Sequence, residues 1–172
     1  MKIRLDQVDK PFDWQETLSL SSKQLDRAEL ISLGEIECRG RVSPMVEDFL
    51  LRATLSYDQE LRCMRCLKPV MASVSTDIEF LLQIGSETVD EERELRTEEL
   101  GVLTVSSPEF DTQPLLIEQI QLAVPMKPLC REDCAGLCTR CGADLNDSPC
   151  GCAAVADPRW AALGALRPGS SD

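Results

Sequence analysis

The chain of 172 residues contains no histidine. Its absence excludes Ser-His and Cys-His nucleophilic catalysis, and it excludes histidine as a metal ligand. There is also no apolar run of the roughly 18–20 residues that a membrane helix needs. The N-terminal residues 1–6 alternate polar and apolar side chains without a hydrophobic segment of signal-peptide type. We therefore expect a cytoplasmic protein that neither enters a membrane nor is secreted. Glycine-rich nucleotide-binding motifs are absent as well, so no small-molecule substrate is expected.

Basic residues are few: 18 stand against 30 acidic ones, which gives a net charge of −12. Such a chain cannot coat nucleic acid, because that mode of binding depends on neutralising phosphates with Lys and Arg. Only residues 38–68 are locally positive. Six cations of this segment fall on predicted adjacent strands and a turn, where they form either an ordinary solvated face or a patch that contacts phosphate: Arg39, Arg41, Arg52, Arg62, Arg65 and Lys68.

Alternating apolar residues run through most of the first two-thirds of the chain and are typical of antiparallel strands with one wet face. The clearest run extends from Val70 to Ile84. An acidic loop at 85–100 follows, with either a merely solvated or a partner-binding role. Next comes an amphipathic helix at 112–124, with Asp111 or Thr112 as its cap and Pro114 in its first turn.

These elements predict an α+β fold with an N-terminal, mainly antiparallel β-sheet and one amphipathic helix. The hydrophobic fraction of 43% supplies a real core for it. We expect a β-rich domain at residues 1–126. A cysteine-rich module at 127–172 would pack on it and end in a short helix that begins at Asp157.

Nine cysteines are far more than expected, and eight of them lie in close pairs. Cys63 and Cys66 form one C-x-x-C motif, and Cys138 and Cys141 form another. Each motif lets two thiolates bind one metal ion, and paired cysteines in a cytosolic chain favour metal over disulfides. We therefore predict two structural zinc ions held by four thiolates each. The eight ligands are Cys63, Cys66, Cys130, Cys134, Cys138, Cys141, Cys150 and Cys152.

The spacing permits two groupings of these thiols. In the first, residues 138–152 close a local site, and Cys63 and Cys66 join Cys130 and Cys134 across the fold. In the second, the two C-x-x-C motifs share one ion. We favour the first grouping, because glycines at 142 and 151 supply the backbone freedom that a local site needs.

Two other chemistries fit the cysteines less well. The spacing of Cys134, Cys138 and Cys141 is that of a radical-SAM cluster, but only 31 residues follow Cys141, too few for the barrel of such an enzyme. A redox-active C-x-x-C needs a βαβ setting, whereas Cys66 precedes a predicted strand. A redox- or zinc-responsive thiol switch remains the alternative function. Cys38 stays apart, in phase with Ile36 and Val42, and is predicted to be a core thiol.

Several segments resemble one family. Residues 63–69, Cys-Met-Arg-Cys-Leu-Lys-Pro, are similar to the C-x-R-C-L-x-P signature of the YceD family, the large ribosomal RNA subunit accumulation proteins. Residues 1–6 resemble the opening strand of that family, and residues 129–146 resemble the tail of its cysteine-rich branch. Residues 157–163 match its closing D-P-R-x-x-x-L motif.

The resemblance implies a bacterial or organellar cytosolic protein needed for accumulation of large-subunit rRNA. Some members of the family lack the last four cysteines, which supports Cys63, Cys66, Cys130 and Cys134 as one site and the other four as an optional second site. We expect a non-enzymatic protein of ribosome biogenesis. Its partner would be the pre-ribosomal large subunit, bound through rRNA, through ribosomal protein or through both.

Overall fold

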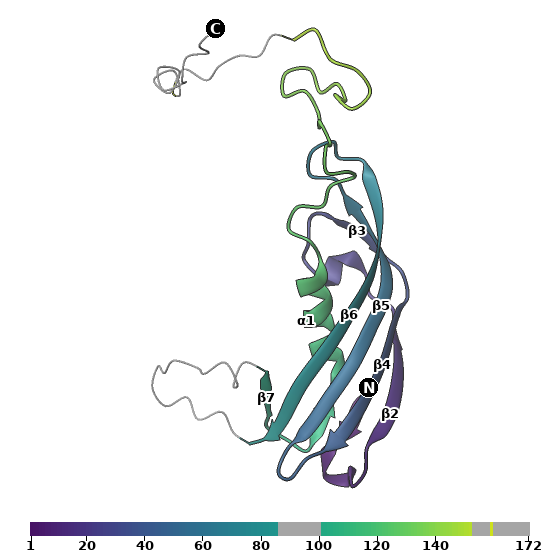
Figure 1. Cartoon of the computed structure of the whole chain (residues 1–172), viewed down its shortest axis with the longest axis vertical. Coiled ribbons are helices and arrows are strands. Elements are labelled where there is room, and N and C mark those ends of the chain that lie inside the picture. Colours follow the sequence, from purple (N-terminus) through teal and green to yellow (C-terminus); the bar gives the residue numbers. More distant parts are fainter. Residues whose placement is uncertain (86–100, 153–158, 160–172) are drawn as a thin grey trace, which may run out of the picture.

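A computed structural model describes residues 1–85, 101–152 and 159. In this part of the chain, a long curved sheet is covered on one face by a helix (Figure 1). The strands, two short 3-10 turns and the helix follow in this order: β1 (Lys2–Arg4), η1 (Leu5–Gln7), β2 (Phe12–Leu18), η2 (Ser22–Gln24), β3 (Leu30–Leu33), β4 (Ile36–Pro44), β5 (Phe49–Arg62), β6 (Pro69–Ile84), β7 (Val102–Val105), β8 (Glu109–Asp111) and α1 (Thr112–Ala123).

The main sheet has the strand order β2-β4-β5-β6-β7, and β3 pairs with β5 outside that path. Its centre is the β5–β6 hairpin, in which residues from Phe49 to Arg62 pair in unbroken antiparallel register with those from Leu82 to Pro69. Only β7 is parallel to its neighbour, β6. Strands β1 and β8 form a separate two-stranded ribbon. The long hairpin matters for function because its turn, at residues 63–68, carries the first C-x-x-C motif.

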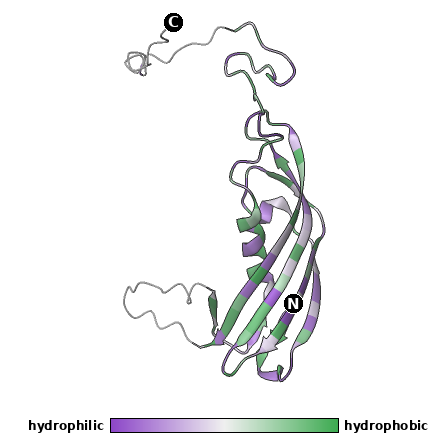
Figure 2. Ribbon diagram, viewed as in Figure 1, coloured by the Kyte–Doolittle hydropathy of each residue, from purple (hydrophilic) through white to green (hydrophobic). Residues whose placement is uncertain are grey.

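Alternation along the strands sorts side chains between two faces, as the hydropathy colouring shows (Figure 2). In β5, odd-numbered residues from Leu51 to Leu61 are buried, and most even-numbered ones are exposed. Cys38 lies in this core with no exposed surface, as predicted. Burial raises the pKa of its thiol to about 11, with a smaller contribution from the Glu16 carboxylate.

Helix α1 begins where the sequence predicts. The Asp111 side chain accepts a hydrogen bond from the backbone N–H of Gln113 and so caps the first turn. Leu116 and Ile120 are buried against the sheet. Pro125 and Pro128 follow the helix and turn the chain toward the end of the β5–β6 hairpin.

The predicted fold class is confirmed: the protein is α+β, with a mostly antiparallel sheet, one helix in the described part of the chain and cysteine clusters in its C-terminal part. The acidic stretch 86–100 and the expected terminal helix lie outside the described residues. The division into domains at residue 126 stays a prediction. None of the described helices has the length and apolar character that a bilayer crossing requires.

Candidate metal centres

The first C-x-x-C motif forms the turn between β5 and β6, residues 63–68, which we call the first knuckle. The backbone N–H of Cys63 donates to the carbonyl oxygen of Lys68 over 2.9 Å, and that of Leu67 donates to Cys63 over 2.9 Å. This tight turn places Leu67 in the left-handed region with φ of 62°. Both thiols therefore project from one end of the sheet toward the segment that follows α1.

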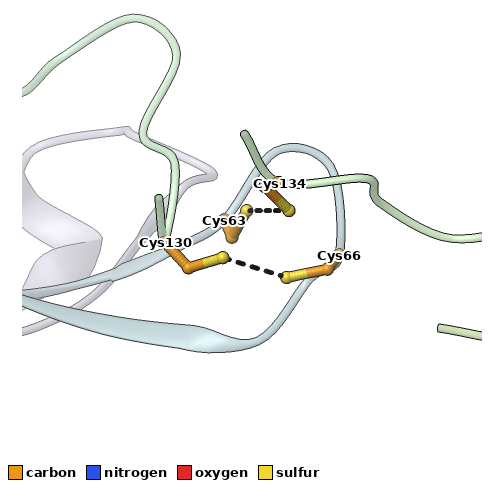
Figure 3. Close-up of side chains that lie close together, drawn as sticks. All are labelled: Cys63, Cys66, Cys130 and Cys134. Atoms are coloured by element: carbon orange, nitrogen blue, oxygen red, sulfur yellow. Dashed lines mark hydrogen bonds between the residues drawn. The ribbon is translucent and has the colours of Figure 1, made fainter. Parts of the chain in front are cut away.

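Cys130 and Cys134 come from that segment and face the first knuckle (Figure 3). The sulfur atoms of Cys63 and Cys134 are 3.8 Å apart, and those of Cys66 and Cys130 are 3.6 Å apart. All four sulfurs, which we call the first tetrad, lie within 4.8 Å of one another. Cys63, Cys66 and Cys134 are buried, whereas Cys130 is exposed.

Four further thiols form the second tetrad, with sulfurs again within 4.8 Å of one another: Cys138, Cys141, Cys150 and Cys152. Its C-x-x-C turn closes through a backbone hydrogen bond of 2.8 Å from Gly142 to Cys138, with Gly142 at φ of 73°. Cys141 is exposed, and the other three are partly exposed. The structure thus brings the eight thiols together in the first of the two groupings that the spacing permits.

The distances in the first tetrad suit a tetrahedral metal. Four sulfurs at about 2.3 Å from a zinc ion lie about 3.8 Å from one another. Two of the separations, 3.6 and 3.8 Å, agree with this value, the others are within 4.8 Å, and all nine cysteines are free thiols. Four closely spaced thiols that contribute only sulfur form the donor set of a structural zinc or iron–sulfur site.

The pKa values of the thiols also favour a metal site at each tetrad. Burial alone would raise the pKa of Cys63, but backbone N–H groups of Cys66, Arg65 and Cys130 outweigh it and lower this pKa to about 6. In the second tetrad, the backbone N–H groups of Cys141 and Arg140 lower the pKa of Cys138 to about 6. Neighbouring thiols raise the pKa of Cys130 and of Cys152 to about 12. Each tetrad therefore contains one thiol that loses its proton readily, and a bound cation would favour the thiolate form of the neighbours whose pKa is raised. Each could hold a metal ion.

The six predicted contact residues fall into two groups in the structure. Three lie on the outward face of β4 and β5, each in an ion pair. Arg41 contacts Asp13 at 2.6 Å, Arg52 contacts Glu79 at 2.6 Å and Arg39 contacts Glu37 at 3.2 Å. The three arginines line a shallow depression of about 850 Å³. Three carboxylates line it too and balance the charge: Asp13, Asp77 and Glu79. This face is not a basic surface.

The other three, Arg62, Arg65 and Lys68, lie at or beside the first knuckle. Arg65 donates to the carbonyl oxygen of Cys134 over 2.8 Å, and Lys68 forms an ion pair of 2.7 Å with Asp144. Arg62 is exposed and makes no ion pair with any residue in the described part of the chain. The sequence alone groups the six cations together, because spacing does not reveal which of them have acidic partners.

Asn146 is a site residue that the sequence alone does not predict. Its side-chain Nδ2 lies 3.5 Å from the sulfur of Cys134, although Asn146 itself belongs to the loop between Cys141 and Cys150. Asn146 thus belongs to the loop of the second tetrad but contacts a sulfur of the first. A polar residue between two cysteine pairs was the available signal, but it did not reveal which tetrad the side chain contacts.

Comparisons with known proteins identify the family of the chain. Residues 51–167 match the family described as "Large ribosomal RNA subunit accumulation protein YceD". The chain is 34% identical over 123 residues to uncharacterized proteins of Mycobacterium bovis and Mycobacterium tuberculosis, covering 72% of this chain and 58% of theirs. It is 31% identical to an uncharacterized protein of Mycobacterium leprae, covering 72% and 55% of the two chains. The chain thus spans a little over half the length of these relatives. No solved structure matches.

The chain belongs to the YceD family. The matched region includes the β5–β6 hairpin except for the first two residues of β5, and it includes the first knuckle, α1 and all eight clustered cysteines. Its two tetrads suggest the zinc-binding branch of that family. The family description links its members to large-subunit ribosomal RNA.

Proposed function

We propose that this protein is a non-enzymatic factor that supports assembly of the large ribosomal subunit, or accumulation of its rRNA, in the bacterial cytoplasm. It acts by binding pre-ribosomal RNA or a large-subunit protein. The observation that carries the proposal is membership of the YceD family, through a match that includes both cysteine tetrads. The partner is accordingly ribosomal, and no small-molecule substrate or membrane is involved.

Zinc in both tetrads has a structural role in this proposal. Eight thiolate ligands hold the two ions: Cys63, Cys66, Cys130, Cys134, Cys138, Cys141, Cys150 and Cys152. Four sulfurs leave a zinc ion no open position for water or substrate, so the metal supplies folding energy rather than catalysis. Residues 127–152 contain only short apolar stretches, and bound metal supplies the order that a hydrophobic core supplies elsewhere.

The first knuckle is the best candidate contact surface. Arg62 is exposed beside it, and the Met64 and Leu67 side chains are each 55% exposed on it. A cation beside two apolar side chains suits both an rRNA loop and a ribosomal protein. The paired residues Arg39, Arg41 and Arg52 are weaker candidates, because an incoming phosphate must displace their carboxylate partners.

Charge favours local docking over general attraction. With two zinc ions and eight thiolates the formal net charge becomes about −16, compared with −12 for the chain alone. Phosphates are repelled by most of such a surface. Affinity must therefore come from a small surface that fits one partner.

The test is purification of the tagged full-length chain from the cytosol of its own organism, with and without nuclease. Immature large-subunit rRNA that co-purifies with large-subunit proteins supports the proposal. A single ribosomal protein retained after nuclease treatment supports it too and identifies a protein contact. A folded, metal-loaded bait that retains no ribosomal material contradicts it.

One observation favours a second candidate, a redox- or zinc-responsive thiol switch. Cys130 and Cys141 are exposed residues, so each tetrad has at least one cysteine at the surface, where oxidants in solution can approach it. Under mild peroxide, a switch would release zinc rapidly while a disulfide forms within the tetrad. Retention of both metals under these conditions contradicts the switch.

A further inference from the structure

The two tetrads are connected through a single side chain. Asn146 lies in the loop between Cys141 and Cys150, yet its Nδ2 is 3.5 Å from the sulfur of Cys134 in the first tetrad. Its Oδ1 accepts hydrogen bonds of 2.8 Å from the backbone N–H of Ala135 and 2.9 Å from Arg131. The amide of one loop is thereby fixed against a thiol of the other site.

Asp144 holds Asn146 in this position. One carboxylate oxygen accepts hydrogen bonds from the backbone N–H of Asn146 at 2.9 Å and from its side-chain amide at 2.7 Å. The other oxygen forms the ion pair with Lys68 at the first knuckle, 2.7 Å away. Lys68 and these amide donors lower the pKa of Asp144 to about 2, so its charge persists at any working pH.

Backbone hydrogen bonds also connect the region around Asp144 and Asn146 to the first knuckle. Leu137 donates from its N–H to the carbonyl oxygen of Arg65 over 3.1 Å, and Leu145 donates to Gly136 over 2.9 Å. Gly136 has φ of 75°, and a Cβ there would lie 3.0 Å from the Arg65 carbonyl oxygen. Only glycine permits this approach without strain.

We infer that the two metal centres are coupled, so that metal in the second tetrad strengthens metal binding by the first. This inference rests on the proposed occupation of both tetrads by zinc. Metal at Cys138, Cys141, Cys150 and Cys152 fixes both ends of the loop that carries Asp144 and Asn146. The fixed loop then donates an amide N–H to Cys134.

A hydrogen bond to a ligating sulfur orients it and stabilises the thiolate form that binds metal. Loss of such a contact typically reduces metal affinity by about 10–100-fold. Because the loop has little buried apolar surface of its own, its position depends on the metal that closes it. Coupling of this kind is reciprocal: metal in the first tetrad strengthens binding at the second by the same factor.

The experiment compares cobalt and zinc affinities of full-length variants by chelator competition, with the cobalt–thiolate absorption bands as the readout. Cys141→Ser combined with Cys152→Ser disables the second tetrad, and we expect the affinity of the first to fall by about 10-fold or more. Asn146→Ala in the otherwise intact chain should cause a comparable loss. Ser148→Ala, an exposed change in the same loop, is the matched control and should leave both affinities unchanged.

Combining Asn146→Ala with the disabled second tetrad separates coupling from simple loss of a contact. If the second metal acts through Asn146, the combined variant loses little more than either change alone. Fully additive losses overturn the inference, as does an Asn146→Ala chain whose first tetrad binds as tightly as the unaltered one. A folded chain that binds no cobalt at either tetrad contradicts the proposed metal centres themselves. This outcome is distinguishable from independent binding, in which both tetrads bind cobalt but neither affects the other.

Discussion

Arg65 and Cys134 are joined by a hydrogen bond of 2.8 Å from the guanidinium group to the backbone carbonyl oxygen. Arg65 also contacts the carbonyl oxygen of Glu132 at 3.3 Å. These contacts tie the first knuckle to the segment that supplies the other half of the first tetrad. Arg62, three residues earlier, has no such structural role among the described residues. The two arginines therefore separate the support of the metal site from the proposed contact with a partner.

Charge reversal should affect the two arginines differently. Arg62→Glu should abolish co-sedimentation with large-subunit particles while zinc content and unfolding temperature stay unchanged. Arg65→Glu should reduce both the co-sedimentation and the zinc content. The introduced carboxylate is repelled by the carbonyl oxygens that the guanidinium group contacts. Gradient sedimentation of extracts and metal analysis of the purified variants measure the two effects.

Arg4→Glu is the matched control, since Arg4 is exposed on β1 and paired with Asp6. It should leave sedimentation unchanged. Equal association of Arg62→Glu and the unaltered protein with the particles rules out the first knuckle as the contact surface.

Metal removal should affect the C-terminal segment far more than the sheet. The sheet and α1 have their own core of 22 buried residues, whereas the cysteine segment depends on its bound ions. We expect a chelator to expose the trypsin sites at Arg131 and Arg140 while the β-type circular dichroism persists. Cleavage mapped by mass spectrometry measures this, and added zinc should restore protection. Cleavage at the same rate with and without chelator would show that the metal does not order this segment.

Much of the sheet follows from the sequence because alternation reports directly on which face is buried. The run from Val70 to Ile84 predicts β6 almost to its ends, and Leu103 with Val105 predicts β7. The parallel pairing of β7 with β6 was not predicted, nor was the pairing of β1 with β8. Both depend on where a distant segment returns, which local periodicity does not encode.

The candidate metal centres, like the sheet, are predicted only in part by the sequence. Cysteine spacing identifies the eight thiols, since chelation by C-x-x-C is a local property. Spacing leaves two groupings open, and only the fold brings the segment after α1 to the β5–β6 turn. Asn146 and the ion pair between Lys68 and Asp144 were not predicted, because each joins residues whose proximity is created by the folded chain. The sequence indicates ligands, whereas the structure shows what supports them.

The contact between Trp14 and Gly40 gives a stability prediction. A Cβ on Gly40 would lie 2.5 Å from the indole of Trp14, which is itself a buried residue of the core. Gly40→Ala should therefore reduce the free energy of unfolding by about 1–3 kcal/mol, the usual cost of overpacking. Urea denaturation in excess zinc measures it. Gly101→Ala, where nothing lies within 4 Å, is the control and should stay within about 0.5 kcal/mol. Equal stability of the two variants would contradict the packing argument.

Cys38 predicts how stability depends on pH in the alkaline range. Burial raises the pKa of this thiol from 9.0 to about 11 in the folded protein. The folded state therefore keeps its proton at pH values where the unfolded chain has lost it. The contribution to stability is complete below pH 9 and is lost as pH rises from about 9 to 11, by about 2–3 kcal/mol in total.

Cys38→Ala removes this group and should flatten the decline in stability between pH 9 and 11, even if the variant is less stable at pH 8. Tyr57, whose pKa burial raises to about 12, leaves a residual slope above pH 10 in both proteins. The eight ligand thiols are the same in both proteins, so their titration cancels when the two declines are compared. Urea unfolding at pH 8, 9.5 and 10.5 measures the difference. If stability declines equally with pH in the two proteins, the pKa of the Cys38 thiol does not differ between the folded and unfolded states, which contradicts the prediction.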